Sequence, residues 1–290
     1  MDDLHIILFY KFVSLTRLKR FRDEHLAYCK KLGVLGKVLI GKEGINGSIS
    51  GTREQIEAYK KHLWADKRFA DIVFKEELGT FAPFRRMLVR VKKEIIRMDV
   101  SVDMNKRGAY IEPDHFLSAC DDPNTLILDT RNDYEWRVGK FKNALTLPIK
   151  NFREFPKAIE KLEHLKNKKV VIYCTGGIRC EKASAYMKEH GFADVSQLHG
   201  GILTFCQQKP NTVWEGSCFV FDNRMVSRVG NEENPITCCI HCQKDCDLYS
   251  NCRNVKCNEQ IIVCPGCKDE HQGCCSTACF EESKKRWHSS

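Results

Sequence analysis

The sequence predicts three successive modules: an α+β sandwich, an α/β domain with a mainly parallel sheet, and a cysteine-rich segment that metal ions hold together. Three observations lead to this prediction. Residues 1–98 follow the order strand, helix, strand, strand, helix, strand. Residues 109–215 alternate strands with helices. In residues 216–290 the cysteines gather, and eleven of the 17 lie between Cys238 and Cys279.

The first module is predicted from apolar spacing and from helix signals. Apolar residues recur at helical intervals between Leu15 and Lys31, and Thr52 followed by Gln55 is a helix-capping pattern. The order of elements is typical of a ferredoxin-like (acylphosphatase-like) sandwich, a fold that hosts many functions. The expected elements are His5–Val13, Leu15–Lys31, Gly36–Ile40, Ile45–Ser50, Thr52–Trp64, Ile72–Glu76 and Met87–Val91.

Two strings of this module are candidates for contact with RNA. GKEGINGSISG (Gly41–Gly51) is either a glycine-permitted hairpin turn or a backbone loop that approaches a phosphate with help from Lys42. FRRMLVRVKKEIIR (Phe84–Arg97) has six basic residues and one acid. It is either a solvated face or a phosphate-contacting stripe with Phe84 free to stack on a base. The candidate contacts here are Arg85, Arg86, Arg90 and Lys92.

The central module follows a polar stretch, residues 99–108, which we interpret as a linker. Alternation of strands and helices predicts a parallel sheet with helices on both sides. The ligand site of such a sheet lies at the carboxyl ends of its strands. The expected elements are Glu112–Cys120, Thr125–Asp129, Phe155–Leu165, Val170–Cys174, Cys180–His190 and Val195–Leu198.

The stretch VVIYCTGGIRCEKAS (Val170–Ser184) is the best candidate for chemistry, because it places a thiol between a strand and a helix. Backbone N–H groups in such a loop converge on its centre, and the helix points its positive end the same way. A thiol placed there ionises easily. We therefore expect a reactive thiolate in an anion-binding loop. The residues concerned are Cys174, Thr175, Gly176, Gly177, Ile178 and Arg179, with Cys180 either resolving an oxidised Cys174 or packing the helix.

The cysteine-rich segment predicts two closed zinc sites. A C-x-x-C pair lets two thiolates meet one metal ion, and four thiolates make a tetrahedral structural site. A segment this polar has too little apolar surface to fold without metal. His241 and His271 are possible substitute ligands. The expected groups are Cys239, Cys242, Cys264 and Cys267 for one site and Cys252, Cys257, Cys275 and Cys279 for the other.

The bulk properties favour a cytoplasmic protein. The chain of 290 residues is 42% hydrophobic and 29% charged, and no apolar run approaches the roughly 20 residues of a membrane span. The start, MDDLHIILFYKFV, has acids where a secretory signal needs bases. Clustered cysteines in a reducing compartment indicate metal ligation rather than disulfides. The net charge of +9 is a weak indication of a polyanionic partner such as RNA.

Several of these strings also carry a resemblance to known families. The pattern C-x-x-x-x-R from Cys174 to Arg179 resembles the active-site loop of rhodanese domains. The wider string CTGGIRCEKAS is similar to that of the bacterial tRNA uridine hydroxylases, which carry a rhodanese domain between two other modules. GKEGINGSISG, RRMLVRVKKEI, DTRNDYE and the cysteine-rich tail resemble the same family in the same order. The resemblance implies a rhodanese domain at 109–215, in which Asp129, Arg131 and Glu135 brace the core.

The resemblance further implies an enzyme that hydroxylates carbon 5 of uridine 34 of tRNA with molecular oxygen, giving 5-hydroxyuridine. The chain contains no H-x-D or H-x-E pair for an iron triad and no flavin, nicotinamide or haem motif. A thiol route is the remaining possibility: Cys174 attacks carbon 6 of uridine, or carries an oxidised or persulfide sulfur. We expect tRNA as the partner, with no membrane and no obligate protein partner.

Two alternatives stay open. A rhodanese sulfurtransferase would pass sulfane sulfur through a persulfide on Cys174, which fits the same loop but leaves the flanking modules without a role. A non-enzymatic RNA-binding protein would use the basic stripe and the zinc tail, with the rhodanese domain as a scaffold. The intact six-residue cysteine loop is evidence against the second alternative.

Overall fold

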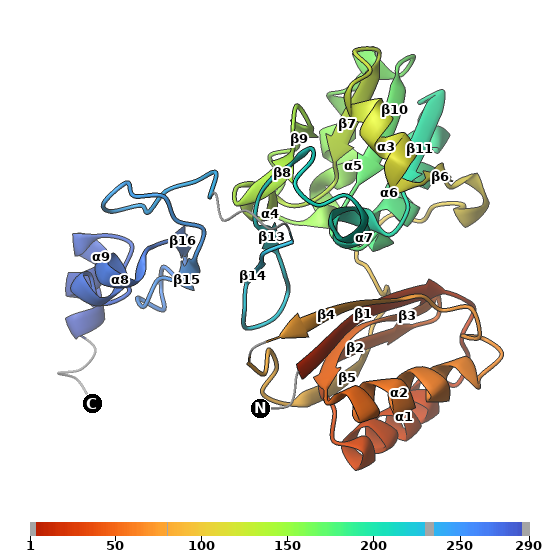
Figure 1. The fold of residues 1–290 in the computed structure, drawn as a ribbon, viewed down its shortest axis with the longest axis horizontal. Coiled ribbons are helices and arrows are strands. Elements are labelled where there is room, and N and C mark those ends of the chain that lie inside the picture. The colour runs from red at the N-terminus through yellow and green to blue at the C-terminus, as the bar shows by residue number, and fades with distance from the viewer. Residues whose placement is uncertain (1–3, 80, 230–234, 286–290) are drawn as a thin grey trace.

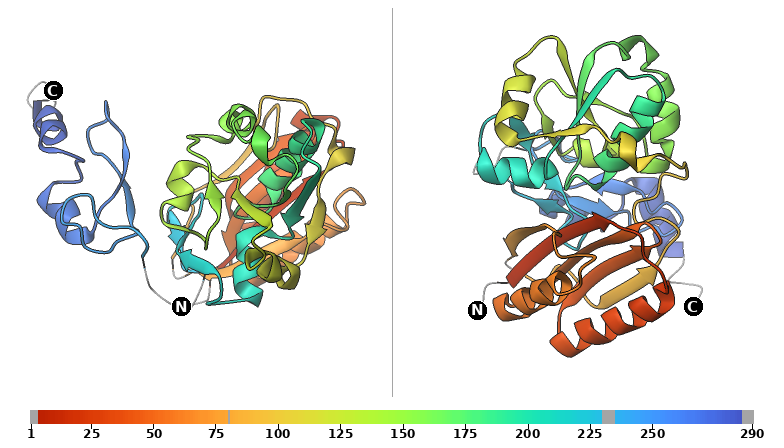
Figure 2. Two further views of the ribbon diagram at one scale, coloured as in Figure 1. Left: turned by 90° about the horizontal axis from the view of Figure 1, so that it is seen from above. Right: turned by 90° about the vertical axis from the view of Figure 1, so that its right-hand side faces the viewer.

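The computed structural model describes residues 4–79, 81–229 and 235–285. Figure 1 shows the first sheet with its two helices beneath it, the central domain above it, and the cysteine-rich tail to one side. The left-hand view in Figure 2 shows the cysteine-rich tail standing apart from the other two modules. The predicted fold class is therefore confirmed, with an α+β sheet, a parallel sheet and a tail whose cysteines form two groups that could hold metal ions.

The first module is one five-stranded sheet with two helices. Its strand order is β4-β1-β3-β2-β5, which is a ferredoxin-like four-stranded sheet with β5 added beside β2. Only β2 and β5 pair in parallel; the other neighbours are antiparallel. The elements are β1 (Leu4–Phe12), α1 (Leu18–Leu32), β2 (Leu35–Gly41), β3 (Gly44–Gly51), α2 (Arg53–Trp64), β4 (Phe74–Gly79) and β5 (Met87–Val91).

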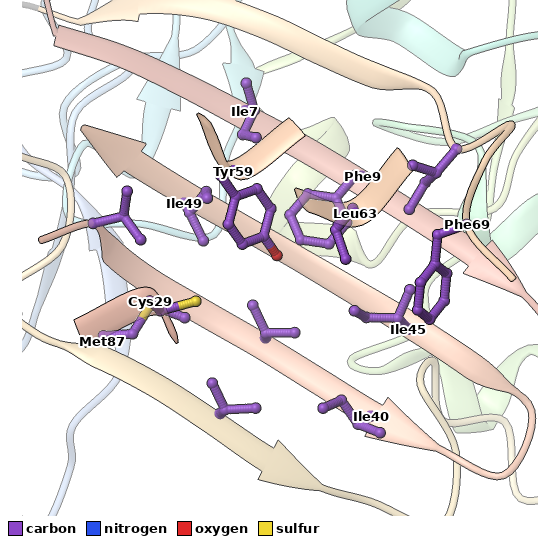
Figure 3. Packing of buried hydrophobic residues seen from close by; sticks show 14 of the residues in the cluster. Ile7, Phe9, Cys29, Ile40, Ile45, Ile49, Tyr59, Leu63, Phe69 and Met87 are labelled. Carbon is purple, nitrogen blue, oxygen red and sulfur yellow. The ribbon is translucent and has the colours of Figure 1, made fainter. Parts of the chain in front are cut away.

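One face of this sheet forms the core with α1 and α2. Alternation along β1 turns Ile7 and Phe9 toward the helices, where both are fully buried (Figure 3). The predicted capping box is present, since Thr52 accepts from the backbone N–H of Gln55 and the Gln55 side chain accepts from that of Thr52. Strand β4 begins two residues later than expected, because Ile72 is a buried loop residue that ends a turn from Phe69.

The opposite face of the sheet is turned to the central domain. Leu8 packs against the hydrophobic core of that domain, although it belongs to β1. Tyr10, two residues along the same strand, donates a hydrogen bond from its hydroxyl to Glu181 at 2.9 Å. In this chain the face without helices is therefore an interface between modules rather than a solvated surface.

The central domain is built on an all-parallel sheet of order β6-β11-β10-β7-β9. The expected helix Phe155–Leu165 is broken, because tight turns at Lys161 and Leu162 separate α5 from a 3₁₀ turn at Glu163–Leu165. The elements are β6 (Ala109–Ile111), α3 (Pro113–Cys120), β7 (Thr125–Asp129), α4 (Asp133–Trp136), β8 (Gly139–Phe141), β9 (Leu145–Thr146), α5 (Phe155–Glu160), β10 (Lys169–Tyr173), α6 (Ile178–Glu189), β11 (Asp194–Leu198) and α7 (Gly201–Gln208).

The polar stretch of residues 99–108, which we interpreted as a linker, is packed against the central domain. Met98, just before it, is fully buried in the core of that domain, and Val102 packs on the same cluster. Residues Met104–Lys106 form a 3₁₀ turn that lies along α6. The connection therefore ties the two modules together instead of letting them move freely.

Helix α6 carries the strongest contacts between the first two modules. The Lys182 side chain is 4% exposed, and its ammonium donates to Glu43 at 3.0 Å, to Glu94 at 2.7 Å and to the carbonyl of Ile96 at 3.1 Å. Glu43 lies at the tip of the β2–β3 hairpin, and its carboxylate also accepts from the backbone N–H of Ile95 at 2.7 Å. Glu43 of the GKEG string and Lys182 of the CEKAS string thus hold the two modules together.

Lys182→Met should weaken the interface between the modules. It leaves two carboxylates, Glu43 and Glu94, without their shared cation, and the expected loss is about 3 kcal/mol of unfolding free energy. Chemical denaturation followed by tryptophan fluorescence measures it. Lys188→Met, at an exposed position of the same helix, is the control and should change stability by less than about 0.5 kcal/mol. Equal stability of the two variants would contradict the stabilising role of Lys182 at the interface between the modules.

The tail begins on the central domain and then leaves it. Strand β12 pairs with β8, and the Tyr249 hydroxyl donates to the carbonyl of Tyr134 at 2.6 Å. Beyond this contact the segment forms two short helices beside a two-stranded ribbon. Its elements are β12 (Trp214–Gly216), β13 (Cys218–Phe219), β14 (Val226–Ser227), β15 (Tyr249–Asn251), β16 (Gln260–Ile262), α8 (Pro265–Glu270) and α9 (Thr277–Lys285).

Candidate active site

Cys174 lies at the carboxyl end of β10, where the loop of residues 174–179 leads into α6. The backbone N–H of Gly177 donates to the Cys174 sulfur at 3.1 Å, in the manner expected of an anion-binding loop. The first residues of α7 fix the loop from behind, because the N–H groups of Ile202 and Leu203 donate to the carbonyls of Cys174 and Thr175. The loop is therefore held rigidly at both faces.

The Cys174 thiol is set up to ionise. Burial alone would raise its pKa, since the residue is fully buried. A hydrogen bond from the Cys180 thiol, the positive charge of Arg179 and two backbone N–H groups outweigh that penalty and lower the pKa to about 6. The thiolate is consequently the main form of Cys174 at neutral pH.

Arg179 is bound to Glu135 rather than left open for a ligand. Both of its terminal nitrogens donate to the Glu135 carboxylate, one of them at 2.7 Å, and one also donates to the Thr175 hydroxyl at 3.3 Å. Burial alone would lower the pKa of Arg179, but the Glu135 charge raises it. Arg179 therefore acts on Cys174 through its charge and through the shape of the loop.

The residues expected to brace the core divide into two pairs. Arg131 makes a fully buried, bidentate pair with Asp129, and its guanidinium also donates to the carbonyl of Gly139. Glu135 touches Arg131 only through its backbone carbonyl, while its carboxylate holds Arg179. The structure thus places Glu135 with the cysteine loop and leaves Asp129 and Arg131 beneath it.

Cys180 is fully buried in the first turn of α6, directly against Cys174. The burial of its thiol raises its pKa, and hydrogen bonding to the Cys174 sulfur raises it further. The Thr130 hydroxyl lies 3.8 Å from the Cys180 sulfur. Cys180 is therefore a protonated thiol that donates to a neighbouring thiolate, and it is also part of the domain core.

The loop opens into a cleft of about 730 Å³ between the first two modules. Residues 174–176 and Arg179 line it from the central domain, and the helix-free face of the first sheet lines it from the other side. A Cβ on Gly176 would lie 2.6 Å from Leu8, so the sheet covers the loop closely. A volume of this size falls in the range of about 300–1,000 Å³ that is usual for small-molecule sites.

Three residues of the cleft carry no signal in the sequence pattern. Lys75 pairs with Leu8 across β4 and β1, which turns it toward the loop, although a lysine on an edge strand ordinarily points to water. Asn132 is 6% exposed and lies in the turn before α4. Phe221, from the segment after β13, is 62% exposed and lies in the cleft with its ring 5.8 Å from the Arg179 guanidinium.

The predicted RNA-contacting side chains lie at different distances from this cleft. Lys92 lines it, as does Phe84. The remaining candidates are exposed but lie outside the cleft lining of the described residues: Lys42, Arg85, Arg86 and Arg90.

The tail cysteines lie in two compact groups, each able to hold a metal ion. The sulfurs of each group are all within 4.8 Å of one another. Individual sulfur pairs are 3.4–3.7 Å apart, against about 3.8 Å in a ZnS₄ tetrahedron with bonds of about 2.3 Å. The rings of His241 and His271 stack with their centres 3.8 Å apart, and the His241 Nε2 forms a hydrogen bond with the carbonyl of Cys274. The groups are Cys239, Cys242, Cys264 and Cys267, and Cys252, Cys257, Cys275 and Cys279.

We expect two zinc ions per chain, because each group offers four thiolates at zinc spacing. Cys242→Ser and Cys257→Ser should each remove about one ion, measured by elemental mass spectrometry of the purified protein. Cys238→Ser changes a cysteine outside both groups and should keep both ions. A chain purified without chelator that carries no zinc would refute the assignment.

The fold and the site together define a multidomain protein with a rhodanese-type cysteine loop under an acylphosphatase-like sheet. Residues 4–95 match the family model described as UPF0176 acylphosphatase like domain, residues 112–208 that of the rhodanese-like domain, and residues 215–280 that of the rhodanase C-terminal region. The chain belongs to the tRNA uridine(34) hydroxylase family, as its similarity to whole relatives shows.

The similarity to relatives of that name extends over almost the whole chain. A tRNA uridine(34) hydroxylase of Cytophaga hutchinsonii is 42% identical over 290 residues, covering 99% of this chain and 93% of the relative. That of the Aster yellows witches'-broom phytoplasma is 40% identical, covering 97% and 94%. That of Staphylococcus aureus strain COL is 39% identical, covering 97% and 91%. Among the described residues, no helix has the length and apolar character to cross a membrane.

Proposed function

We propose that this chain hydroxylates uridine 34 of tRNA at carbon 5, with the Cys174 thiolate as the reactive group. The observation that carries the proposal is the placement of that thiolate in a cleft between two modules, in a chain of this family. Four exposed cations of the cleft form no ion pair with other described residues, so they are available to RNA phosphates. They are Lys37, Lys92, Lys93 and Arg153.

The thiolate supplies the activation that uracil needs. Addition of the Cys174 sulfur to carbon 6 makes carbon 5 electron-rich and able to react with molecular oxygen. The cleft can hold an extruded base, and Phe221 and Phe84 offer aromatic faces on which it can stack. The rigid loop keeps the sulfur in place while the base enters.

Hydroxylation of the base by molecular oxygen needs two electrons in addition to the two that the base supplies. One oxygen atom enters the base, and reduction of the other to water takes two electrons and two protons. Once the base has left Cys174, oxidation of the Cys174 thiolate and the Cys180 thiol to a disulfide releases two electrons and one proton, and solvent supplies the second proton. An external thiol then has to reduce the disulfide before the next turnover.

Sulfur transfer is the second candidate, and the cysteine loop itself favours it. A thiosulfate–cyanide assay on the purified chain separates the two functions. Nucleoside mass spectrometry of tRNA, with and without the gene, is the primary test. Loss of 5-hydroxyuridine on deletion, and its return on complementation, support hydroxylation. Strong sulfur transfer with unchanged tRNA nucleosides would overturn it.

A further inference from the structure

Apart from the four exposed cations, most of the polar side chains that line the cleft are hydrogen-bonded within the protein. Arg179 is bound by Glu135, and Arg224 is bound by Asp222 and by Glu77 at 3.0 Å. The remaining neighbours are satisfied in the same way: Asn46 donates to the carbonyl of Ile95, and Glu94 accepts from Lys182. Two buried polar side chains of the described cleft stand apart from this network: Lys75 and Asn132.

Lys75 is a buried ammonium without a hydrogen bond to any described residue. It is 8% exposed, and its side chain lies over the tip of the cysteine loop, 4.0 Å from where a Cβ of Gly176 would be. Its ammonium is 5.3 Å from the centre of the Tyr10 ring. Burial lowers its pKa to about 8, while the nearby Cys174 and Glu181 act in the opposite direction. An ammonium has three N–H donors and no acceptor, so these donors face the cleft unused.

Asn132 has the complementary defect, a buried acceptor without a donor. Its Nδ2 donates to the Tyr134 hydroxyl at 2.7 Å, but its Oδ1, which lies opposite the backbone N–H of Glu135 in a capping box, makes no hydrogen bond. Its backbone N–H donates to the Glu135 carboxylate at 3.1 Å, the same carboxylate that holds Arg179. Asn132 is thereby fixed at the foot of the cysteine loop. A buried oxygen left unpaired costs about 1–3 kcal/mol, which a donor on a bound molecule would remove.

The unused donors on Lys75 and the unused acceptor on Asn132, both in the lining of the cleft, are complementary in kind to the groups on the edge of one pyrimidine. Uracil presents the N3–H donor between two carbonyl acceptors. Cytosine presents an acceptor at N3 and a donor at its amino group. Its N3 would therefore face the Asn132 acceptor, and its amino group would face the Lys75 donors. A site with buried polar groups strongly rejects an analogue that leaves them unpaired.

We propose that Lys75 and Asn132 read the Watson–Crick edge of the target base, so that the cleft accepts uracil and rejects cytosine. The Asn132 Oδ1 accepts from N3–H, and the Lys75 ammonium donates to the carbonyl at carbon 4, where cytosine carries its amino group. The proposal rests on the proposed function, in which a uridine of tRNA enters the cleft. It gives the first module a direct part in the choice of base, because Lys75 belongs to β4.

The test compares anticodon stem-loops that differ only at position 34, which holds uridine, cytidine or 3-methyluridine. Competition binding to the full zinc-loaded chain measures the preference without turnover. The wild type should bind the uridine RNA at least tenfold more tightly than either competitor. Equal binding of 3-methyluridine RNA would overturn the proposal without the use of any variant.

Variants then assign the preference to the two residues. Asn132→Leu should bring the uridine to 3-methyluridine ratio close to one. Lys75→Met should do the same for the uridine to cytidine ratio, and Lys75→Arg should restore it in part because it keeps a cation. Lys67→Met, on an exposed surface of the first module, is the control and should keep both ratios. Folded variants of Lys75 and Asn132 that keep the wild-type ratios would refute the assignment.

Nucleoside mass spectrometry of the same RNAs and variants, beside the binding test, separates this proposal from the proposed function. One outcome is that the wild type prefers uridine RNA, the variants lose this preference, and no RNA acquires 5-hydroxyuridine. In that case the proposal on base reading holds and the proposed hydroxylation fails. If the wild type hydroxylates and Lys75→Met and Asn132→Leu discriminate as before, hydroxylation holds and base reading fails.

Discussion

Cys174→Ser is expected to abolish 5-hydroxyuridine in tRNA, with a fall in rate of more than about a thousandfold. A serine hydroxyl stays protonated at neutral pH, whereas the surroundings of Cys174 lower the thiol pKa to about 6. The substitution is close in size and keeps the hydrogen-bonding position opposite Gly177. Nucleoside mass spectrometry of tRNA from a deletion strain that expresses the variant measures the effect.

The matched control for this experiment is Cys120→Ser. Cys120 lies half-buried in α3, outside the cleft lining of the described residues, and its substitution should leave the modification near the wild-type level. A Cys174→Ser strain with wild-type amounts of 5-hydroxyuridine would show that the thiol takes no part in the reaction.

Glu135→Gln should strongly destabilise the central domain. Arg179 would remain buried, with its side chain 5% exposed, beside a neutral amide instead of a carboxylate. Removal of one partner of a buried ion pair typically costs about 3–5 kcal/mol. Chemical denaturation measures the loss, and Glu160→Gln, an exposed change on α5, should cost less than about 0.5 kcal/mol.

The double variant Glu135→Gln with Arg179→Met separates stability from chemistry. Removal of both charges should recover part of the stability that Glu135→Gln loses, because no buried charge is left unpaired. Activity should stay low, since the Cys174 thiolate loses a nearby cation. A loss below about 1 kcal/mol for the single variant would contradict the importance of the pair.

The arrangement of modules changes what the cysteine loop can do. Leu8, Tyr10 and Lys75 of the first sheet cover a loop whose sulfur is fully buried. The loop chemistry is that of a rhodanese domain, but its surroundings are a two-module cleft with basic and aromatic side chains. A site of this shape suits an extruded base better than a small free anion, which needs no such cover.

The capping box at Thr52 and the strands β5 and β7 follow from local spacing, and the structure has them at the predicted residues. The thiol loop after β10 was also recognisable from its own few residues. Local patterns predict such features because hydrogen bonds between near neighbours form them. The structure differs from the local pattern where tertiary contacts override it. An example is the segment after Met98, which packs on the core of the central domain.

The sequence by itself determined the order of the three modules, the position of the reactive thiol and the metal-like spacing of the tail cysteines. Only the tertiary structure decided which charges meet. Arg179 pairs with Glu135, and Lys182 reaches Glu43 across 139 positions of the chain. Lys75 and Asn132 come from different modules to the same cleft. Pairings of this kind depend on how separate surfaces dock, and no local period of the sequence encodes that docking.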